Sequence, residues 1–238
     1  MGLMITLHTL RGRFGLESLS PFCMKAEVYM KLAKLEYRAM PSDPRKAPKK
    51  KLPIIDDGGK VVCDSTAIID YLEKKSDKPL DEGLSEIDRA RARMIQRTFE
   101  EGLYFVALWS RWVDDEGWAL SKTLLGDIPA AVRWAILPIV RKQMTGYTHA
   151  QGTGRHSREE IFEMGVKDLR AFTTLLGDSP FVLGDRVRTV DCTTYSFLAN
   201  ILLAPVENPM KDYVKSEPKL EAYVKRMQEL TKRADKPS

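Results

Sequence analysis

The chain has 238 residues, of which 43% are hydrophobic and 30% are charged, and its formal net charge is +5 at pH 7. This balance is that of a globular protein, and the length suits one large domain or two modest ones. Basic residues are interspersed with acidic ones and do not alternate with aromatic residues along a strand, so the sequence predicts no nucleic-acid binding.

The three cysteines, Cys23, Cys63 and Cys192, are widely spaced, with neither a CxxC pair nor histidine-rich neighbours. This usage predicts neither a disulfide framework nor a bound metal, and it favours a reducing, cytoplasmic setting. The longest apolar run, residues 195–206, is shorter than the roughly 20 residues that cross a bilayer, so we expect no membrane span.

The N-terminal third of the chain predicts a small α/β unit. A β-rich segment at 4–10 is followed by apolar residues at helical spacing over 21–35 and by a short strand candidate at 36–40. Further along, the segments "LPIID" and "KVVCD" are joined by a glycine-rich turn, which is typical of a β-hairpin. Ser65 then has the position of an N-cap for a helix that ends near Lys75.

The rest of the chain is predicted to be helical. The segment "SEID" at 85–88 resembles a capping box that opens a long amphipathic helix, and no alternating strand pattern persists beyond it. A segment of linker composition precedes this helix. We therefore predict an α/β domain over 1–76, a linker over 77–84 and an all-helical domain over 85–238.

Three motifs follow one another in the first unit: "SPFC" opens its first helix, "KLPII" opens its third strand and "DSTAIIDYLE" follows its fourth. With the helical second half, this pattern resembles the cytosolic glutathione S-transferase superfamily over the whole chain. A narrower match, "QGTGRHSREEI" followed by "KDLRAFTTLLGDSPFVLGDRVRTVDC", resembles the branch of the failed axon connections and metaxin proteins. The resemblance implies a thioredoxin-like N-terminal domain and an all-helical C-terminal glutathione-transferase domain.

The resemblance also implies glutathione as co-substrate. A strand-to-helix junction offers a carboxylate, a hydroxyl and free N–H groups, which suits the charged γ-glutamyl head, and the resemblance assigns that head to Asp64 and Ser65. By the same resemblance the main chain of Leu52, beside a cis Pro53, pairs with the cysteinyl unit. Lys51, nearest that turn in a basic loop, is the candidate for the glycyl carboxylate. The alternatives are that Ser65 only caps its helix and that the basic loop is simply solvated.

The glutathione thiol must ionise to act as a nucleophile, and a pKa near 8.5 leaves a free thiol mostly protonated at neutral pH. Lowering that pKa by about two units requires roughly 2.7 kcal/mol. One hydrogen bond to a charged group contributes about 1.5–3 kcal/mol, and a helix N-terminus about 0.3–1 kcal/mol more. Pro21 suits the first helical position, so Ser20 is the predicted N-cap and the candidate catalytic hydroxyl, with Ser18 in reserve.

Cys23 stands where a CxxC motif would have its second cysteine, with Ser20 in place of the first. Inert burial is the favoured interpretation of this thiol, and a glutathione-dependent thiol–disulfide reductase that uses Cys23 is an alternative. Another alternative is a non-catalytic binding or adaptor protein that keeps the fold.

We expect the second substrate to be a small apolar electrophile and the reaction to serve detoxification. Residues at helical spacing early in the second domain are candidates for its site, although such spacing more often reflects core packing. They are Tyr104, Phe105, Trp109, Trp112, Trp118, Trp134, Met144 and Tyr147. The resemblance allows a homodimer but does not establish one, because the loop before "KLP" lacks the aromatic residue that some related classes use as a dimer contact.

Two positions in the helical half carry structural expectations. Related sequences place Ser or Thr three residues before the position of Asp191, but Arg188 stands there and Thr189 follows it, so we expect a shifted or weakened cap for the central helix. Arg155 and His156 are expected to serve a turn and its salt bridges.

Overall fold

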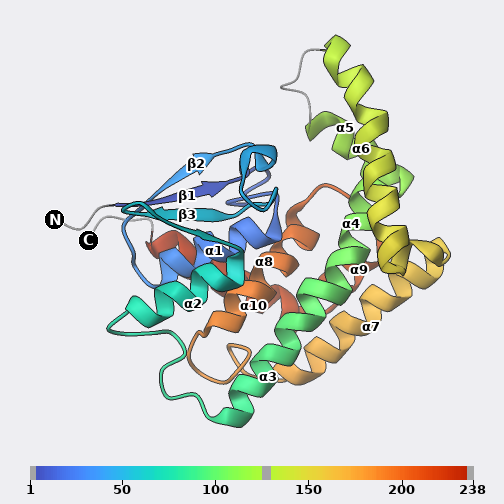
Figure 1. Ribbon diagram of the computed structural model, residues 1–238. Helices are drawn as coiled ribbons and strands as arrows, with labels where there is room; N and C mark the ends of the chain where they lie inside the picture. The colour runs from blue at the N-terminus through green and yellow to red at the C-terminus, as the bar shows by residue number, and fades with distance from the viewer. Residues whose placement is uncertain (1–3, 125–129, 235–238) are drawn as a thin grey trace.

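The computed structural model describes residues 4–124 and 130–234. Its N-terminal part contains a four-stranded sheet and the rest is helical, which confirms the predicted fold class (Figure 1). The strands are β1 (Ile5–Thr9), β2 (Tyr37–Pro41), β3 (Ile54–Asp57) and β4 (Lys60–Cys63), in the order β2-β1-β3-β4. The α-helices are α1 (Pro21–Leu32), α2 (Ser65–Lys75), α3 (Glu86–Arg97), α4 (Tyr104–Trp112), α5 (Asp115–Leu124), α6 (Ala130–Gln151), α7 (Arg158–Leu176), α8 (Thr189–Leu203), α9 (Pro209–Ser216) and α10 (Pro218–Ala234).

The register of the sheet brings three loops to one edge. β1 and β2 are parallel, so Thr9 and Pro41 lie side by side where both strands end. β3 is antiparallel to both of its neighbours and begins at Ile54, which lies opposite His8 of β1 and opposite Cys63, the last residue of β4. The segments that follow β1, precede β3 and follow β4 therefore meet at one edge, and they carry the "SPFC", "KLP" and "DS" motifs.

The predicted hairpin between β3 and β4 is confirmed. Asp57 pairs with Lys60, which leaves a two-residue turn made of Gly58 and Gly59. Both glycines have positive φ, 62° and 93°, the conformation that a tight hairpin turn of this kind requires and that glycine adopts without steric cost.

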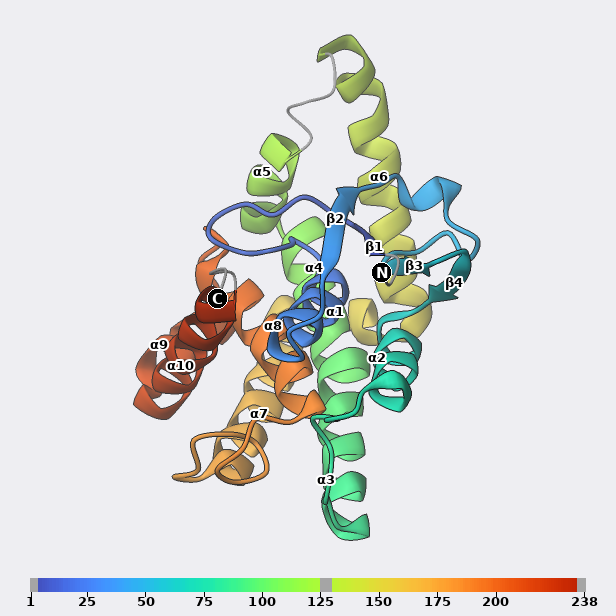
Figure 2. The ribbon, with the colours of Figure 1, turned by 90° about the vertical axis from the view of Figure 1, so that its left-hand side faces the viewer.

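Helices α1 and α2 lie between the sheet and the helical part (Figures 1 and 2). Residues 23–30 of α1 are all buried, because this helix packs against α8, α2 and α10. At the start of α1 the ring of Phe22 meets Tyr104 of α4 and Phe197 of α8 edge to face, with centroid distances of 5.0 and 5.5 Å. The start of α1 is therefore held by two helices of the C-terminal part.

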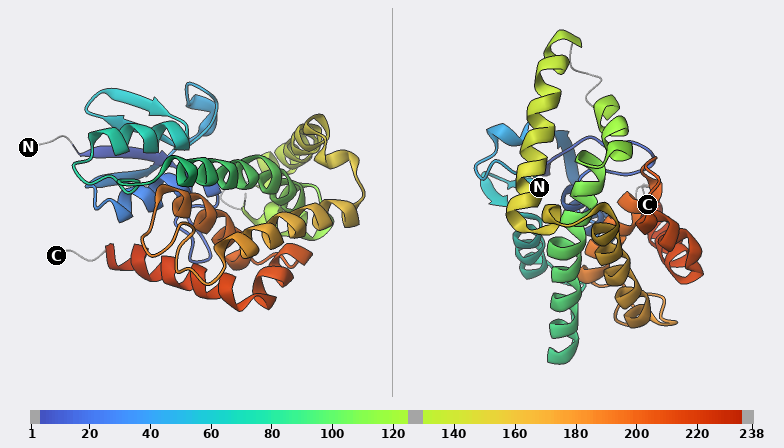
Figure 3. Two further views of the ribbon diagram at one scale, coloured as in Figure 1. Left: turned by 90° about the horizontal axis from the view of Figure 1, so that it is seen from below. Right: turned by 90° about the vertical axis from the view of Figure 1, so that its right-hand side faces the viewer.

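The long helix predicted from residue 85 is present, with one irregular turn. Ser85 caps it, since its Oγ accepts the N–H of Asp88 at 3.2 Å. α3 then passes through a π-helical segment, Thr98–Leu103, into α4, and Figure 3 shows the three pieces as one continuous rod. The π segment was not predicted from the sequence, where apolar spacing alone indicated a regular helix.

The central helix α8 is anchored by the buried carboxylate of Asp191. One oxygen accepts the N–H of Val182 and the hydroxyl of Tyr223, both at 2.9 Å, and the other accepts the N–H of Arg188 at 2.8 Å. Burial raises the pKa of Asp191 to about 6, although these three hydrogen bonds act in the opposite direction.

The first N–H group of α8, that of Thr189, is capped by the segment between α2 and α3. Asp81 accepts the N–H and the hydroxyl of Thr189, at 2.9 and 2.6 Å. The guanidinium of Arg188 in turn donates to the carbonyls of Leu80 and Glu82, both at 2.7 Å. The predicted shift of the cap is wrong, because Arg188 is itself the N-cap and α8 begins at Thr189. The missing hydroxyl at position 188 is replaced by the carboxylate of Asp81, far away in the sequence.

The segment around Arg155 and His156 forms the expected turn. Arg155 donates from Nε to the carbonyl of His149 at 2.9 Å, and His156 Nδ1 lies 3.6 Å from the carboxylate of Glu160. Ser157 and Glu160 form a reciprocal capping box at the start of α7.

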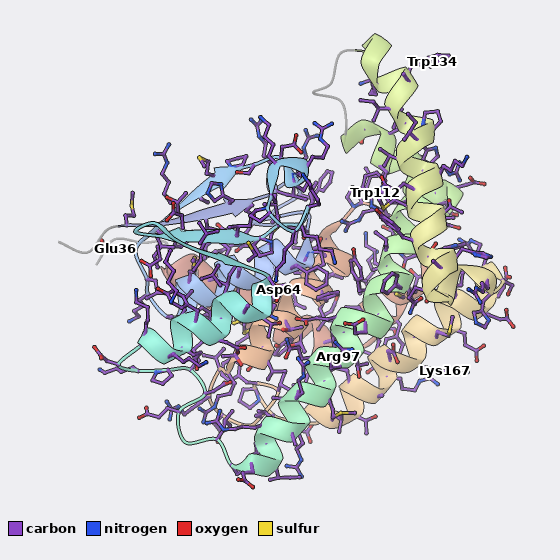
Figure 4. The ribbon with its side chains drawn as sticks, viewed as in Figure 1. Glu36, Asp64, Arg97, Trp112, Trp134 and Lys167 are labelled. Atoms are coloured by element: carbon purple, nitrogen blue, oxygen red, sulfur yellow. The ribbon has the colours of Figure 1, made fainter. Side chains whose placement is uncertain are left out.

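Helices α5 and α6 extend beyond the rest of the helical part (Figures 1 and 2). The side chain of Trp134, near the outer end of α6, is 82% exposed, and that of Tyr147 is 51% exposed (Figure 4). These two aromatic residues therefore do not contribute to the core. Within residues 4–124 and 130–234, no helix combines the length and the hydropathy needed to cross a membrane.

Candidate functional site

Ser20 is the N-cap of α1, as predicted. Its Oγ accepts the N–H of Cys23 at 3.4 Å, and Pro21 is the first helical residue. Ser18, two residues earlier, is fully buried, and its hydroxyl accepts the N–H of Ser20 at 3.3 Å. Ser20 is partly exposed. Ser20 can therefore present its hydroxyl to a ligand, whereas the buried hydroxyl of Ser18 stabilises the loop by accepting the N–H of Ser20.

Cys23 is fully buried behind these serines. Its thiol lies within hydrogen-bonding reach of the hydroxyls of Thr9, Ser18 and Ser20 and of the main chain of Leu10. Burial raises the pKa of the Cys23 thiol above its ordinary value, and these hydrogen bonds only partly offset that effect. A buried, protonated thiol favours the inert interpretation of Cys23 over the redox one.

Two polar residues of the helical part hold the serine loop, and the sequence interpretation missed both. Arg111 of α4 donates from Nη1 to the carbonyl of Leu19 at 2.6 Å and from Nη2 to Asn200 Oδ1 at 3.2 Å. Asn200 of α8 donates from Nδ2 to the carbonyl of Ser18 at 3.4 Å. The available signal was a charged residue and an amide inside the apolar helical segments "YFVALWSRW" and "YSFLANILL".

The turn before β3 has the form that the resemblance implied. The peptide bond between Leu52 and Pro53 is cis, and the carbonyl of Pro53 accepts the N–H of Asp64 at 3.3 Å. The turn that carries "KLP" and the junction that carries "DS" are therefore in direct contact.

In the basic loop upstream of this turn, some basic side chains form ion pairs or hydrogen bonds, and at least one forms neither with the described residues. Arg45 pairs with Asp43 at 2.8 Å, and Lys50 donates to the carbonyl of Arg45 at 2.7 Å. Lys51 is exposed beside the cis turn, and within the described ranges it forms neither a hydrogen bond nor an ion pair. Its ammonium group is therefore available to a ligand.

The N-cap of α2 is Asp64, which corrects the prediction of Ser65. Asp64 Oδ1 accepts the N–H groups of Thr66 and Ala67 at 3.0 and 3.3 Å. Asp64 rather than Ser65 is the N-cap because it lies one residue earlier in the sequence. From that position its side-chain oxygen reaches the N–H groups of the second and third helical residues. Ser65 is then the first helical residue, and its hydroxyl forms no hydrogen bond with any residue that the structure describes.

The backbone of Asp64 has φ 91° and ψ 132°, which a residue with a side chain adopts only at a cost of about 1–3 kcal/mol. Such conformations concentrate at ligand sites, where the surrounding structure holds them in place. Here the restraint comes from the caps on α2 and from the contact with Pro53. Figure 4 shows Asp64 at the start of α2, on the side of the sheet edge described above.

A buried polar cluster fixes the first turn of α2. Thr66 Oγ1 accepts from Lys25 Nζ of α1 at 2.8 Å and from Gln96 Nε2 of α3 at 2.7 Å. The ammonium of Lys25, which is 2% exposed, also pairs with Glu100 at 2.6 Å. The junction that carries Asp64 is thus tied to both parts of the chain.

An apolar pocket opens at the residue that follows Ser20. Its empty space, counted together with the solvent at its mouth, is about 580 Å³. Of the aromatic candidates, Tyr104 and Trp112 line it, whereas Trp109 packs on Phe162 with a centroid distance of 5.8 Å. Its walls include Pro21, Tyr104, Leu108, Arg111, Trp112 and Phe197.

Within the described ranges, no group of three or more His, Cys, Asp or Glu residues could hold a metal ion. The three cysteines are free thiols. The residues brought together are a capping hydroxyl, a cis-proline turn, a strained carboxylate and an exposed lysine, next to an apolar pocket.

A four-stranded sheet with a cis-proline turn, a capped first helix and an all-helical second part define the glutathione-transferase fold. Residues 21–117 match the family model of the Glutathione S-transferase N-terminal domain, and residues 165–227 match that of the Glutathione S-transferase C-terminal domain. Isoprene-epoxide–glutathione S-transferase of Rhodococcus sp. (strain AD45) is 31% identical, over 94% of this chain and 98% of its own length. The chain belongs to the glutathione S-transferase family.

The predicted branch is confirmed as well. Failed axon connections of Drosophila melanogaster is 31% identical over 90% of this chain and 54% of its own length, so the chain spans about half of that relative. Metaxin-2 of Homo sapiens is 21% identical over 77% of this chain and 70% of its own length.

Solved structures agree on the fold. Glutathione transferase GSTFuA3 of Phanerochaete chrysosporium has a TM-score of 0.66 at 17% identity and covers 100% of both chains. A glutathione S-transferase of Ceriporiopsis subvermispora in complex with glutathione has a TM-score of 0.63 at 15% identity and covers 99% of both chains. At these identities the similarity establishes the fold alone.

Proposed function

We propose that this protein is an enzyme that ionises the thiol of glutathione through the Ser20 hydroxyl and transfers the thiolate to a small apolar electrophile. One observation carries the proposal: a partly exposed serine caps α1 at the sheet edge where the "KLP" turn and the "DS" junction meet, and the apolar pocket begins at the next residue. Nucleophile activation and electrophile binding would thus occur side by side.

The binding groups at the sheet edge suit the parts of glutathione. Asp64 Oδ1 caps α2, and the other carboxylate oxygen would accept from the ammonium of the γ-glutamyl head. The N–H and hydroxyl of Ser65, at the positive end of the α2 dipole, would receive the carboxylate of the same head. The main chain of Leu52 would pair with the cysteinyl unit, and Lys51 would meet the glycyl carboxylate.

The activation step needs one donor. The Ser20 oxygen accepts from the Cys23 N–H, which leaves the hydroxyl proton free to be donated to a sulfur atom. A hydrogen bond to a charged group contributes about 1.5–3 kcal/mol and the α1 dipole about 0.3–1 kcal/mol, which together supply the roughly 2.7 kcal/mol required to lower the thiol pKa by two units. The proton lost by the thiol passes to solvent.

Two measurements test this proposal. Isothermal titration calorimetry should show glutathione binding, and the protein should conjugate a generic aryl halide. The relative named for isoprene epoxide makes a small epoxide a suitable second electrophile. A protein that neither binds glutathione nor conjugates any of these electrophiles would refute the proposal.

The relatives named Failed axon connections and Metaxin-2 support one rival, a binding or adaptor protein. That rival predicts partner binding that is independent of glutathione and unaffected by Ser20→Ala. An enzyme requires glutathione and loses turnover when Ser20 is replaced.

Replacing Lys51 or Ser65 should weaken glutathione binding. Because the contact to an exposed ammonium is worth about 1 kcal/mol at most, Lys51→Gln should raise the dissociation constant up to about fivefold. Ser65→Ala removes a hydrogen bond to a charged group and should raise it about tenfold or more. Calorimetric titration measures both, with Lys46→Gln in the same loop as the matched control. Equal effects of Lys51→Gln and Lys46→Gln would mean that the loop is only solvated.

Replacing Cys23 should leave conjugation intact. Cys23→Ser keeps a small polar group among the hydroxyls that surround the thiol, so kcat/KM for conjugation should stay within about threefold of the original value, typical of a substitution that touches no reacting atom. The same variant should be assayed for glutathione-dependent disulfide exchange. If the original protein catalyses this exchange and Cys23→Ser abolishes it with Ser20 intact, the reductase alternative is correct.

A further inference from the structure

The outer half of α6 is apolar in sequence but lies at the surface. Residues 130–140, "AAVRWAILPIV", contain a single charged residue, Arg133, which is the composition of a core helix. The helix nevertheless extends, together with α5, beyond the rest of the helical part (Figures 1 and 2). Trp134 is 82% exposed and Ile139 is 65% exposed, although a core helix would bury both. Such residues indicate an interaction site when they form one patch.

Five exposed residues share one face of this helix, which we call the outer face of α6, because positions i, i+1, i+4, i+5 and i+8 are neighbours on a helix. They are Trp134, Ala135, Pro138, Ile139 and Lys142. Another side of α6 is held against α4 and α5: Arg141 donates from Nη2 to the carbonyl of Val113 at 2.7 Å and pairs with Asp115 at 2.6 Å. The patch of four apolar residues and one lysine is therefore on a helix that is anchored elsewhere.

The segment that contains this face also carries the net charge of the protein. Residues 117–158 hold six Lys and Arg residues and one Asp, so they account for the whole formal net charge of +5, and the rest of the chain is balanced. Most of this segment lies between residues 21–117 and 165–227, the two parts that match the family models. Lys122, Arg133 and Lys142 form no ion pair with any residue that the structure describes. Their charges are available to an anionic partner.

We propose that the outer face of α6 binds an anionic membrane surface, with Trp134 and Ile139 inserted among the lipid headgroups and Arg133 and Lys142 against their phosphates. Helices that lie in a membrane interface combine Lys and Arg with Trp and aliphatic residues, and the Trp ring favours the level of the headgroups. The anionic charge of the membrane complements the unpaired cations of the segment. Because the outer end of α6 projects from the rest of the molecule, with Trp134 near its tip, an extended surface can reach it (Figure 4). The inference does not depend on the proposed conjugation.

Sedimentation with lipid vesicles tests this proposal. The protein should sediment with vesicles of mixed phosphatidylcholine and phosphatidylserine but not with vesicles of phosphatidylcholine alone, and added salt should weaken the binding. Trp134→Ala and Ile139→Gln should each lower the partition coefficient about tenfold or more, the scale of burying one large apolar side chain. The double variant Arg133→Gln with Lys142→Gln should lower it about 25-fold, since each cation near an anionic surface contributes about fivefold.

Matched controls separate the outer face from general properties of the protein. Leu175→Gln changes an aliphatic residue of α7 that is also 65% exposed, so it matches Ile139→Gln. Lys225→Gln with Lys232→Gln, at exposed positions of α10, gives the same net charge as the double variant of α6. Both controls should keep the partition coefficient within about twofold, because charges farther from the membrane than the screening length contribute little. The replaced side chains of α6 lie at the surface, so the variants should fold, and circular dichroism checks this.

Three results would overturn the proposal. One is an original protein that sediments with neither kind of vesicle. Another is an equal loss of binding in the controls and in the α6 variants, which would show attraction by net charge alone. The last is vesicle binding that Trp134→Ala leaves unchanged; if the same variant dissociated a dimer in analytical ultracentrifugation, the outer face would be an interface between copies of the chain instead.

Discussion

Ser20→Ala should lower kcat/KM for conjugation about 10- to 100-fold, because it removes the hydrogen bond's share of the thiolate stabilisation, about 1.5–3 kcal/mol, and leaves that of the α1 dipole. Glutathione should still bind, since the charged ends of the tripeptide do not depend on this hydroxyl. The pH–rate profile should shift towards the pKa of a free thiol, near 8.5. Steady-state kinetics across pH, with binding measured in parallel, checks both statements.

Glycine and threonine variants separate the catalytic role of Ser20 from its cap. Ala at an N-cap costs about 1 kcal/mol of stability, whereas Gly costs only a few tenths, yet both lack the hydroxyl. Ser20→Gly and Ser20→Ala should therefore lose the same activity while differing in stability, and Ser20→Thr should retain activity. If activity instead followed stability, with Ser20→Gly close to the original protein, Ser20 would be a cap and no more. Ser18→Ala controls for the reserve serine, which is buried.

Asp191→Asn should give the largest loss of stability, about 2–3 kcal/mol in the free energy of unfolding at neutral pH. The asparagine amide keeps one acceptor oxygen, so an N–H donor now aimed at the carboxylate, that of Val182 or Arg188, would face an NH₂ group. Urea denaturation measures the loss. Asp178→Asn, which removes an exposed ion pair with Lys219, is the control and should change stability by less than about 0.5 kcal/mol.

The effect of Asp191→Asn should depend on pH with a defined sign. The pKa of Asp191 is raised from 3.8 to about 6 in the folded chain. Because the folded state binds this proton more tightly than the unfolded state, the corresponding stabilisation is fully present below about pH 4 and is lost as the pH rises through about 6. Asparagine does not titrate, so the stability gap between the original protein and the variant should narrow over that window. A gap that widens as the pH rises would contradict the raised pKa.

Sequence patterns predicted the fold correctly where a feature depends only on residues that are neighbours in the sequence. The helical spacing after Pro21, the two-glycine hairpin turn and the cap at Ser85 depend on a few neighbouring residues, and each is present in the structure. The N-cap of α2 was misassigned by one residue, because Asp64 and Ser65 are both good caps and only the backbone conformation at Asp64 decides between them. The π-helical segment before α4 was not predicted, because it does not visibly change the spacing of the apolar residues.

The parts of the site that escaped prediction depend on contacts between distant segments. Arg111 and Asn200 reach the serine loop across 92 and 182 positions of sequence, and nothing near either residue indicates its partner. Asp81 replaces the missing cap hydroxyl of α8 across 108 positions. Ser20, in contrast, was predictable because its neighbour Pro21 marks the start of a helix.

The most direct test of the central claim is the thiol pKa of bound glutathione, measured by the ultraviolet absorbance of its thiolate as the pH is raised. In the original protein we expect this pKa to lie about two units below the 8.5 of a free thiol, and in Ser20→Gly to return close to that value with glutathione still bound. An equally low pKa in both proteins, or an unshifted pKa in the original, would contradict the claim that the Ser20 hydroxyl activates the thiol.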